Sequence, residues 1–355
     1  MTSRIVLNGS YLNLRMTGVG TYILNLWRCW KAQGLPVRGL LPPEFASGQA
    51  VKLRGHLPRL AWNQIVLPTL LKPGELLFNP VPEGPILCAH PQVTFAHDVI
   101  PLIYPEWFPR KQNYFKYLVP VCLKRSQHVL CNSQTTRQDL IRFYDLRPEQ
   151  LSVVPLAYDR ERFFPGRADP VCLAKYGLHD QGYMFYVGAH EPHKNLKRLI
   201  EAFVQIAKIW EGNFVIAGAF DPRYTPALQA LAASLKISER VQWLDYISAA
   251  DLSELYRGAR LFAFVSLYEG FGLPVLEAMA CGTPTLTSNR GALQEVAQAG
   301  ALCVDPESIE AICAGITQLL EGGSHFHRAG LARSTIFSWE RTAECTWQAL
   351  TPFMG

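Results

Sequence analysis

Short apolar runs alternate with helix-forming stretches through the second half of the chain. The apolar runs have the length and composition of buried strands and lie at 183–188, 213–218, 241–244 and 261–264. Apolar positions recur with helical spacing in the stretches between and after them, at 195–210, 226–236, 249–258 and 273–281. Strands and helices that alternate in this way predict a doubly wound parallel sheet, which binds its ligands at the carboxyl ends of the strands.

The first half of the chain is also α/β, with a less regular pattern. Strands are expected at 4–8, 93–97, 129–132 and 151–155, and helices at 22–32 and 134–143, the second capped by Ser133. Between residues 35 and 90, prolines interrupt short apolar runs, and the pairing of strands there stays open. Pro120 is expected to break or kink a helix within 109–125.

A chain of 355 residues exceeds what one hydrophobic core usually serves, so two domains are expected. The stretch 156–166 follows Pro155, contains Pro165 and many charged residues, and is the best linker in the sequence. We therefore place an N-terminal domain at 1–165 and a C-terminal domain at 166–337. A last amphipathic helix is expected within 338–355.

The segment 266–284 holds the densest group of informative residues. It follows an apolar strand and carries Gly270 and Gly272, which permit a tight turn, and then Pro274, which suits the first turn of a helix. The helix is expected to stop at Gly282. Its amino end would present unpaired N–H groups and a positive dipole to a phosphate or to sugar oxygens.

Two carboxylates bracket this turn, Glu269 before it and Glu277 within the helix. An ionised carboxylate has two acceptor oxygens, which suit a pair of neighbouring hydroxyls such as those of a ribose or a hexose. Polyol and phosphate groups together indicate a nucleotide sugar. The alternative is an ordinary strand–turn–helix unit with two incidental glutamates.

The run from Glu269 to Glu277 resembles the E-x7-E signature of the retaining glycosyltransferases of family 4, also called group 1. The resemblance implies the GT-B fold, in which two Rossmann-like, doubly wound parallel-sheet domains face each other across a cleft. It also implies that Glu277 holds the ribose hydroxyls of the donor. Glu269 and the amides of Gly270, Phe271 and Gly272 would hold the donor hexose, and the last helix would cross back onto the N-terminal domain.

The segment 188–195 closes one strand and opens a helix, and it carries Lys194, a cation suited to a leaving diphosphate. The family usually has arginine where this chain has His193, and often where it has Ala189. Both departures reduce the positive charge available to the diphosphate, so Lys194 is expected to be its main cation and His193 a donor contact. A surface lysine at a helix start is the alternative.

Two further candidates lie in the N-terminal half. Gly18 and Gly20 precede an expected helix and could let the backbone approach a ligand, and in the family a similar glycine loop faces the donor diphosphate. His97 ends a strand, where an imidazole with one nitrogen anchored can donate from the other to a sugar hydroxyl or interact with the reacting centre. The resemblance implies that His97 contacts the donor sugar near the site of transfer. A plain turn and a core histidine are the alternatives.

The composition indicates the class of protein and its expected location in the cell. Apolar residues make up 49% of the chain and charged residues 18%, which is typical of a folded globular enzyme, and nine cysteines occur without a C-x-x-C pair. No signal peptide and no apolar run of membrane-spanning length is recognised, so a cytoplasmic protein is expected.

The net charge of +5 is unevenly divided. Residues 1–165 carry 19 Lys and Arg against 10 Asp and Glu, a balance of +9, whereas the remaining residues carry 15 against 19, a balance of −4. The basic half could meet an anionic lipid at the inner membrane face, for example through Arg110, Lys111 and Lys116, or could simply be a solvated surface. No nucleic acid partner is expected.

The sequence therefore predicts transfer of a hexosyl group, with retention, from GDP-mannose or a UDP-hexose to a saccharide or lipid-linked acceptor of the cell envelope. No Asp-x-Asp motif is present to hold a divalent cation, so neither a metal nor another cofactor is expected. The alternatives are a non-catalytic protein that binds nucleotide sugars and a sugar-nucleotide epimerase on the same fold.

Overall fold

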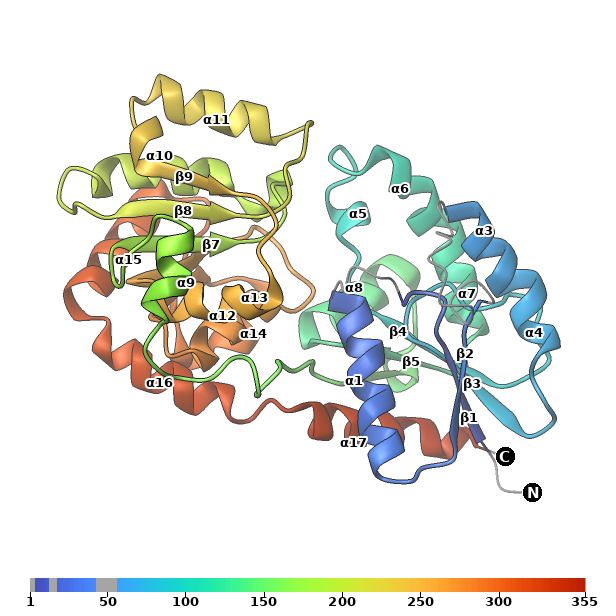
Figure 1. Ribbon diagram of the computed structural model, residues 1–355. Coiled ribbons are helices and arrows are strands. Elements are labelled where there is room, and N and C mark those ends of the chain that lie inside the picture. The colour runs from blue at the N-terminus through green and yellow to red at the C-terminus, as the bar shows by residue number, and fades with distance from the viewer. Residues whose placement is uncertain (1–3, 13–17, 43–55, 355) are drawn as a thin grey trace. The chain divides into compact units, whose positions relative to one another are not determined.

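The computed structural model describes residues 4–12, 18–42 and 56–354, which form two compact units (Figure 1). Unit 1 comprises Met1–Leu156 together with Trp339–Gly355, and unit 2 comprises Ala157–Ser338. The chain thus enters unit 2 at Ala157, at the start of the stretch 156–166. The final helix of the chain belongs to unit 1.

Unit 1 is built on a six-stranded parallel sheet with the order β2-β1-β3-β4-β5-β6. The strands are β1 (Arg4–Asn8), β2 (Val37–Leu40), β3 (Glu75–Asn79), β4 (Gln92–Ala96), β5 (His128–Cys131) and β6 (Leu151–Val153). Strand β1 lies between the edge strand β2 and strand β3, and its Ile5 pairs with Val37 on one side and with Leu76 on the other. The sheet is buried on both faces, which explains its continuous apolar runs.

The described helices of unit 1 connect these strands in sequence. They are α1 (Gly18–Ala32), α3 (His56–Ala61), η1 (Trp62–Val66), α4 (Leu67–Thr69), α5 (Ile100–Ile103), α6 (Pro109–Asn113), η2 (Tyr114–Leu118), α7 (Val119–Arg125), α8 (Gln134–Tyr144), η3 (Pro148–Gln150), α17 (Trp339–Leu350) and η7 (Thr351–Phe353). Helices α1 and α17 pack together, and the indole Nε1 of Trp30 donates to the carbonyl of Ala343 over 3.0 Å. This contact ties the end of the chain to its beginning.

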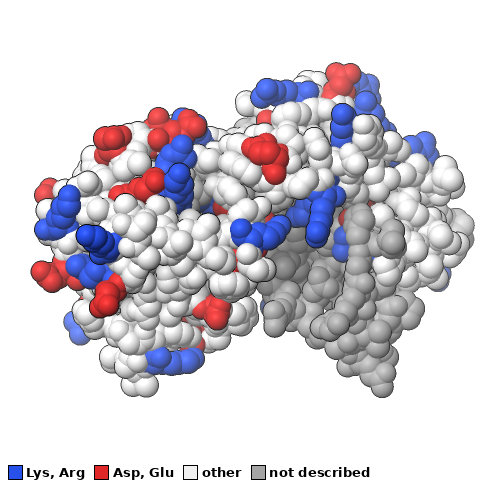
Figure 2. Space-filling view, turned by 90° about the horizontal axis from the view of Figure 1, so that it is seen from above, with Lys and Arg blue, Asp and Glu red and all other residues white. Residues whose placement is uncertain are grey.

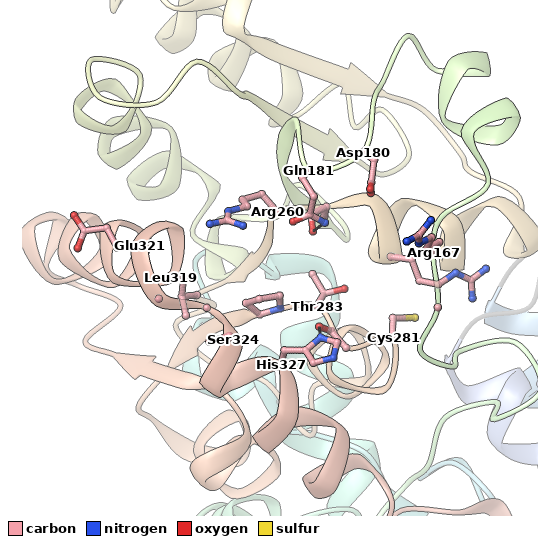
Figure 3. Close-up of a pocket in the computed structure, with 17 residues that line it drawn as sticks. Arg167, Asp180, Gln181, Arg260, Cys281, Thr283, Leu319, Glu321, Ser324 and His327 are labelled. Carbon is pink, nitrogen blue, oxygen red and sulfur yellow. Dashed lines mark hydrogen bonds between the residues drawn. The ribbon is translucent and has the colours of Figure 1, made fainter.

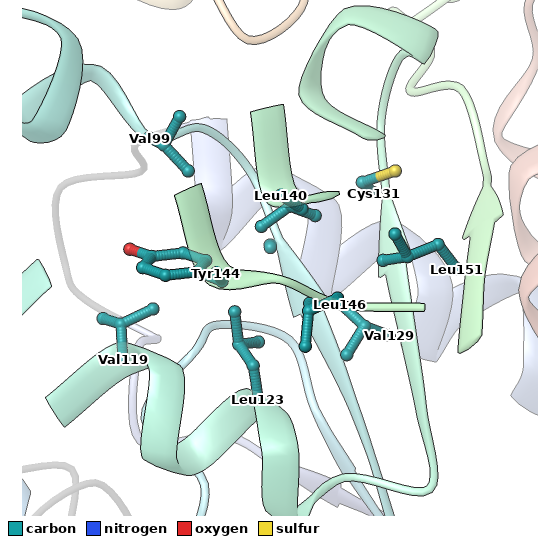
Figure 4. Packing of buried hydrophobic residues seen from close by; sticks show 10 residues of the cluster. Val99, Val119, Leu123, Val129, Cys131, Leu140, Tyr144, Leu146 and Leu151 are labelled. Atoms are coloured by element: carbon teal, nitrogen blue, oxygen red, sulfur yellow. The ribbon is translucent and has the colours of Figure 1, made fainter. Parts of the chain in front are cut away.

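A hydrophobic cluster fills the space between helices α7 and α8 and strands β4 to β6 (Figure 4). Leu123 of α7, Leu140 and Tyr144 of α8 and Val129 of β5 are all buried in it. The Tyr144 hydroxyl satisfies its hydrogen bond on the carbonyl of Phe115, 2.9 Å away. This packing anchors β4, the strand that carries His97 at its carboxyl end.

Helical turns of the π type occur before two prolines of unit 1. Turn η1 ends two residues before Pro68, and turn η2 ends two residues before Pro120. Proline has no N–H and clashes with the carbonyl four residues earlier, and a wider turn relieves both problems. The expected break at Pro120 is therefore a local widening, and the helix continues from α6 through η2 into α7.

Unit 2 contains a second six-stranded parallel sheet with the order β12-β11-β10-β7-β8-β9. The strands are β7 (Tyr183–Val187), β8 (Asn213–Ala217), β9 (Val241–Leu244), β10 (Leu261–Phe264), β11 (Thr285–Ser288) and β12 (Leu302–Val304). Strands β7 and β10 are direct neighbours, with Phe185 opposite Phe262, although two other strands lie between them in the sequence. The parallel, doubly wound sheets expected from the sequence are confirmed in both units.

Helices cover both faces of this second sheet. They are α9 (Pro170–Lys175), η4 (Pro192–Lys194), α10 (Leu196–Ile206), α11 (Thr225–Ser234), η5 (Ser238–Arg240), α12 (Ala249–Gly258), α13 (Leu273–Ala280), α14 (Gly291–Ala297), η6 (Gln298–Gly300), α15 (Ile309–Gly322) and α16 (Ser324–Ser334). Helix α10 packs with α11 and α15, whereas α12 packs with α9 and α13. Because β7 and β10 are parallel neighbours, the loops that follow them lie side by side at the carboxyl ends of the strands.

Candidate active site

The amino end of α13 is set by its glycines, as the sequence predicts. Gly272 caps the helix at φ 109°, and a Cβ atom there would lie 2.5 Å from Cδ2 of Leu293, so only glycine fits. Pro274 occupies the first turn, and Gly282 follows the helix at φ 78°. Pro274 has no N–H, and the amides of Val275 and Leu276 donate to the carbonyl of Gly272 at 3.1 and 3.3 Å. The amide of Leu273 is therefore the first-turn donor that has no acceptor within α13.

Lys194 and Glu269 form an ion pair beside this helix end. The Nζ atom of Lys194 lies 2.6 Å from Oε1 of Glu269, and the two side chains are only 16% and 11% exposed. The same Nζ lies 5.5 Å from the centre of the Phe264 ring. The two residues proposed to contact the diphosphate and the hexose are therefore direct neighbours.

Backbone contacts between the β7 and β10 loops hold this pair in place. The N–H of Leu267 donates to the carbonyl of His193 over 2.8 Å. Asn195 has a left-handed conformation (φ 62°), and its Nδ2 donates to the carbonyls of Val265 and Pro306 at 3.0 and 2.6 Å. Sequence reasoning missed Asn195, although an asparagine directly before a helix is a signal for a left-handed turn.

Two of the expected donor contacts have buried side chains. The His193 side chain is 2% exposed, and the Phe271 ring packs 6.0 Å from the Phe337 ring, centre to centre. Phe271 can therefore serve a ligand through its backbone amide, as the resemblance implies. The backbone carbonyl of His193 accepts from the N–H of Leu267. Because the His193 side chain is buried, Lys194 is the cation of this loop that a ligand can reach.

Glu277 lies on α13 and accepts a hydrogen bond from Tyr256. The Tyr256 hydroxyl, from α12, is 3.1 Å from Oε2 of Glu277. Burial raises the pKa of Glu277 to about 7; the Tyr256 hydrogen bond and the nearby Arg162 charge oppose this increase, and Asp159 adds to it. Tyr256 thus holds one oxygen of the Glu277 carboxylate. The sequence could not predict this contact, because the helical spacing of Tyr256 is that of an ordinary core residue.

His97 lies at the carboxyl end of β4 in unit 1. Its Nε2 is 2.8 Å from the carbonyl of Pro80, and since a carbonyl only accepts, Nε2 carries the proton. Burial lowers the pKa of His97 to about 4, so the ring is neutral and Nδ1 is an acceptor. The expectation that the second nitrogen of His97 would donate is therefore wrong, because Nδ1 of the neutral ring can only accept a hydrogen bond.

The two N-terminal glycines lie inside a helix rather than in a loop before it. Helix α1 starts at Gly18, four residues earlier than expected, so Gly18 and Gly20 are part of its first turn. Their amides belong to the group that lacks intrahelical acceptors. Tyr22, one residue beyond that turn, packs its ring edge-on against His97 at 5.6 Å, which places the start of α1 near His97.

Within the described part of the chain, no cluster of three or more His, Cys, Asp or Glu side chains could hold a metal ion, and all nine cysteines are free. Among those same residues, no helix is both long enough and apolar enough to cross a bilayer.

Comparison with known families assigns both halves of the chain. Residues 16–162 match the model described as Glycosyltransferase Family 4, and residues 174–332 match the model of the Glycosyl transferases group 1. The chain is 32% identical over 268 residues to O-antigen chain mannosyltransferase B of Escherichia coli, covering 74% of this chain and 69% of that protein. The chain belongs to the group 1 glycosyltransferases, and it is a glycosyltransferase with the GT-B fold.

Other relatives and structures agree with this assignment. The chain is 31% identical over 242 residues to O-antigen chain mannosyltransferase RfbU of Salmonella typhimurium, which covers 66% of this chain and 64% of that relative. Sucrose-phosphate synthase from Thermosynechococcus elongatus matches with a TM-score of 0.77 at 19% identity, over 99% of this chain and 98% of the other. WaaG, a glycosyltransferase involved in lipopolysaccharide biosynthesis, matches with a TM-score of 0.73 at 17% identity, over 98% and 99%.

Proposed function

We propose that this protein transfers a mannosyl group from GDP-mannose to a hydroxyl of a saccharide or lipid-linked acceptor in cell-envelope polysaccharide synthesis, with retention of the anomeric configuration. The observation that carries the proposal is the partly buried Lys194–Glu269 pair beside the amino end of α13, the helix that also carries Glu277. The choice of mannose is supported by the O-antigen mannosyltransferases among the relatives. A UDP-hexose is the competing donor.

Glu277 is proposed to bind the ribose of the donor. Tyr256 occupies one side of the carboxylate, which leaves acceptor positions for two neighbouring hydroxyls. The carboxylate must be ionised to accept from both. Because the pKa of Glu277 is about 7 in the free protein, donor binding would draw the proton off this group.

The ion pair is proposed to open when the donor binds. Lys194 would turn to the diphosphate, since its single positive charge then faces an anion that carries more charge than Glu269. Glu269 would accept hydrogen bonds from the hexose hydroxyls, and the amides of Gly270, Phe271 and Gly272 before α13 would donate to its oxygens. In the free protein, the pair keeps both charges neutralised in a partly buried setting.

In the proposed step, the bond between the anomeric carbon and the diphosphate oxygen breaks while the acceptor oxygen bonds to the same face of the sugar. The acceptor proton passes to the departing diphosphate, whose charge is stabilised by Lys194 and helix amides. No protein carboxylate is assigned as a covalent nucleophile. His97 would accept a hydrogen bond from a donor hydroxyl through Nδ1.

A direct test measures donor binding and turnover on the same preparation. Thermal shift with GDP-mannose, UDP-glucose and free mannose compares donors, and a ligand at a hundred times its dissociation constant adds roughly 2.7 kcal/mol of stability. We expect stabilisation by GDP-mannose and release of GDP on addition of an acceptor. Stabilisation by UDP-glucose alone would show that UDP-glucose, and not GDP-mannose, is the donor. Binding without turnover would indicate a non-catalytic protein, and release of an epimerised nucleotide sugar would indicate an epimerase.

We also propose that unit 1 contacts anionic membrane lipids. Arg110, Lys111 and Lys116 are exposed on α6 and η2, and Tyr117 beside them is 62% exposed. On the face seen in Figure 2, the charged residues of unit 1 are mostly Lys and Arg, whereas unit 2 mixes both signs. Binding to vesicles with anionic lipid should weaken with salt and in the Arg110/Lys111/Lys116 triple alanine variant. Unchanged binding by that variant would exclude this patch.

A further inference from the structure

A polar cavity lies in unit 2, away from the residues proposed to bind the donor. It has a volume of about 480 Å³ and is lined by segments that precede strands β7, β10 and β11 and by the junction of α15 and α16 (Figure 3). These are the amino ends of strands β7 and β10, whose carboxyl ends lead to Lys194 and Glu269. The cavity therefore lies at the amino ends of the strands, opposite the carboxyl ends that carry the proposed donor residues.

Two guanidinium groups line this cavity without a carboxylate partner. Arg260 donates from Nη2 to the carbonyl of Leu320, at the end of α15, and its Nε and Nη1 form no hydrogen bond or ion pair with described residues. Arg167 is exposed and forms no hydrogen bond or ion pair with any described residue. Both residues thus have several unused donors that are directed by a rigid, planar group.

A third guanidinium is buried in the wall of the cavity. The Arg257 side chain is 5% exposed; it pairs with Glu254, and it lies 4.6 Å above the Phe164 ring. Its Nε atom is buried and has no hydrogen-bond partner among the described residues. A buried guanidinium with an unsatisfied donor is costly, and a bound anion would offset that cost.

Helix α16 and His327 add donors on another side. No side chain caps the amino end of α16, which begins at Ser324. The Nδ1 of His327 donates to the carbonyl of Gly282, which leaves Nε2 for a ligand. The first-turn amides of a helix of eleven residues are a favourable environment for phosphate oxygens.

Acidic residues are also part of the lining. Asp180 and Glu321 are exposed, and Figure 3 shows the Glu321 carboxylate pointing away from the Arg260 guanidinium. Carboxylates at the edge of a cationic cavity disfavour a simple polyanion such as a nucleic acid. They suit a ligand that combines a phosphate with hydroxyl groups, because hydroxyls donate to carboxylates.

We propose that this cavity binds the phosphate monoester of a sugar or another small polyol. The phosphate is held by Arg260 and Arg167 together with the amino end of α16, and the hydroxyls are held by Asp180 and Gln181 at the edge. The cavity volume exceeds what inorganic phosphate alone would fill. This site is independent of the proposed donor and of the transfer reaction.

Isothermal titration calorimetry of the full chain with glucose 6-phosphate tests the proposal, with glucose and inorganic phosphate as matched partial probes. We expect one site per chain, at least tenfold weaker binding of inorganic phosphate, and no binding of glucose. Binding should fall at least tenfold in Arg167→Glu, a variant at an exposed position without contacts, and in Arg260→Gln. The Lys194→Ala variant should bind glucose 6-phosphate as the unaltered protein does.

The outcomes separate this cavity from the donor site. Absence of binding at millimolar probe would overturn the proposal, as would equal affinity of Arg167→Glu and the unaltered protein. Loss of binding in Lys194→Ala alone would place the probe in the donor site and would also overturn it. Arg260 also donates to a carbonyl at the end of α15, so Arg260→Gln could lose binding through loss of stability. If the thermal midpoint of Arg260→Gln is lowered, the result with Arg167→Glu decides the test.

Discussion

Lys194 Nζ lies 2.6 Å from Glu269 Oε1, although the two residues are 75 positions apart in the chain. Strands β7 and β10 are neighbours in the sheet of unit 2, so the loops after them bring the cation and the carboxylate together. The free protein therefore holds the two groups that we propose for the diphosphate and the hexose in a neutral pair. On this proposal, donor binding exchanges the pair for contacts with the ligand.

Replacing Lys194 by alanine should lower kcat by about 10²- to 10³-fold, because the departing diphosphate loses its main cation. Steady-state kinetics with GDP-mannose would measure the effect. The matched control is Lys197→Ala on the next helical turn, an exposed residue 3.9 Å from Glu201, which should stay within about twofold of the unaltered enzyme. A Lys194→Ala enzyme with more than half the original kcat would exclude the proposed role.

Glu277→Ala should raise the dissociation constant of the donor by about 10- to 100-fold, because the ribose hydroxyls lose a charged acceptor. Titration calorimetry with GDP isolates this effect from catalysis. Tyr256→Phe is the companion variant: it removes the hydrogen bond to Oε2 and keeps the ring in the core, so a smaller loss is expected. Unchanged GDP affinity in Glu277→Ala would remove Glu277 from the donor site.

The pKa of Glu277 gives a pH dependence with a defined sign. The folded protein binds a proton between pH 4.5, the ordinary pKa, and about 7, whereas the unfolded chain has lost it. The free energy of unfolding of the donor-free protein should therefore decrease through this range, by on the order of 3 kcal/mol. Donor affinity should increase between about pH 6 and 8. Denaturation and binding at several pH values, with Glu277→Gln as the pH-insensitive comparison, would check both trends.

His97→Ala should lower kcat by about 10- to 100-fold with a smaller effect on donor affinity, because one acceptor near the reacting sugar is lost. With a pKa of about 4, His97 stays neutral at and above pH 5.5, so the two enzymes should show parallel pH–rate profiles from there to pH 8.5. His325→Ala, at an exposed position, should leave kcat unchanged. A titration near pH 6.5 that disappears in His97→Ala would contradict the neutral acceptor.

Gly272→Ala should destabilise unit 2 by about 1–3 kcal/mol, because the position combines φ 109° with a Cβ atom 2.5 Å from Leu293. Gly34→Ala separates the two causes: Gly34 has φ 67° with nothing within 4 Å, so only the conformational cost applies there. Urea denaturation would compare the two variants. Equal losses would show that the contact with Leu293 relaxes.

Mannosyl transfer should proceed at an unchanged rate after dialysis against EDTA. The chain has no Asp-x-Asp motif, and the charge of the diphosphate is assigned to Lys194 and to helix amides. The measurement is turnover in EDTA against turnover with Mg²⁺ or Mn²⁺. Activity that disappears in EDTA and returns with either cation would show that a metal takes part.

The sequence by itself determined the features that depend on neighbouring residues. Alternating strands and helices specified parallel, doubly wound sheets, since strands that take helical crossovers must run in the same direction. Gly272, Pro274 and Gly282 set the ends of α13, because caps and first turns are governed by local backbone conformation. The E-x7-E run lies within a single strand–turn–helix unit, so its two glutamates could be named as candidate site residues without knowledge of the fold.

Only the tertiary structure decided what each candidate side chain faces. The partner of Lys194 depends on which strands are neighbours, and no local sequence pattern predicts the order of strands in a sheet. The raised pKa of Glu277 comes from burial beside Tyr256, and the proton on Nε2 of His97 is fixed by the carbonyl of Pro80. These contacts join segments distant in sequence, so their chemistry exists only when the chain is folded.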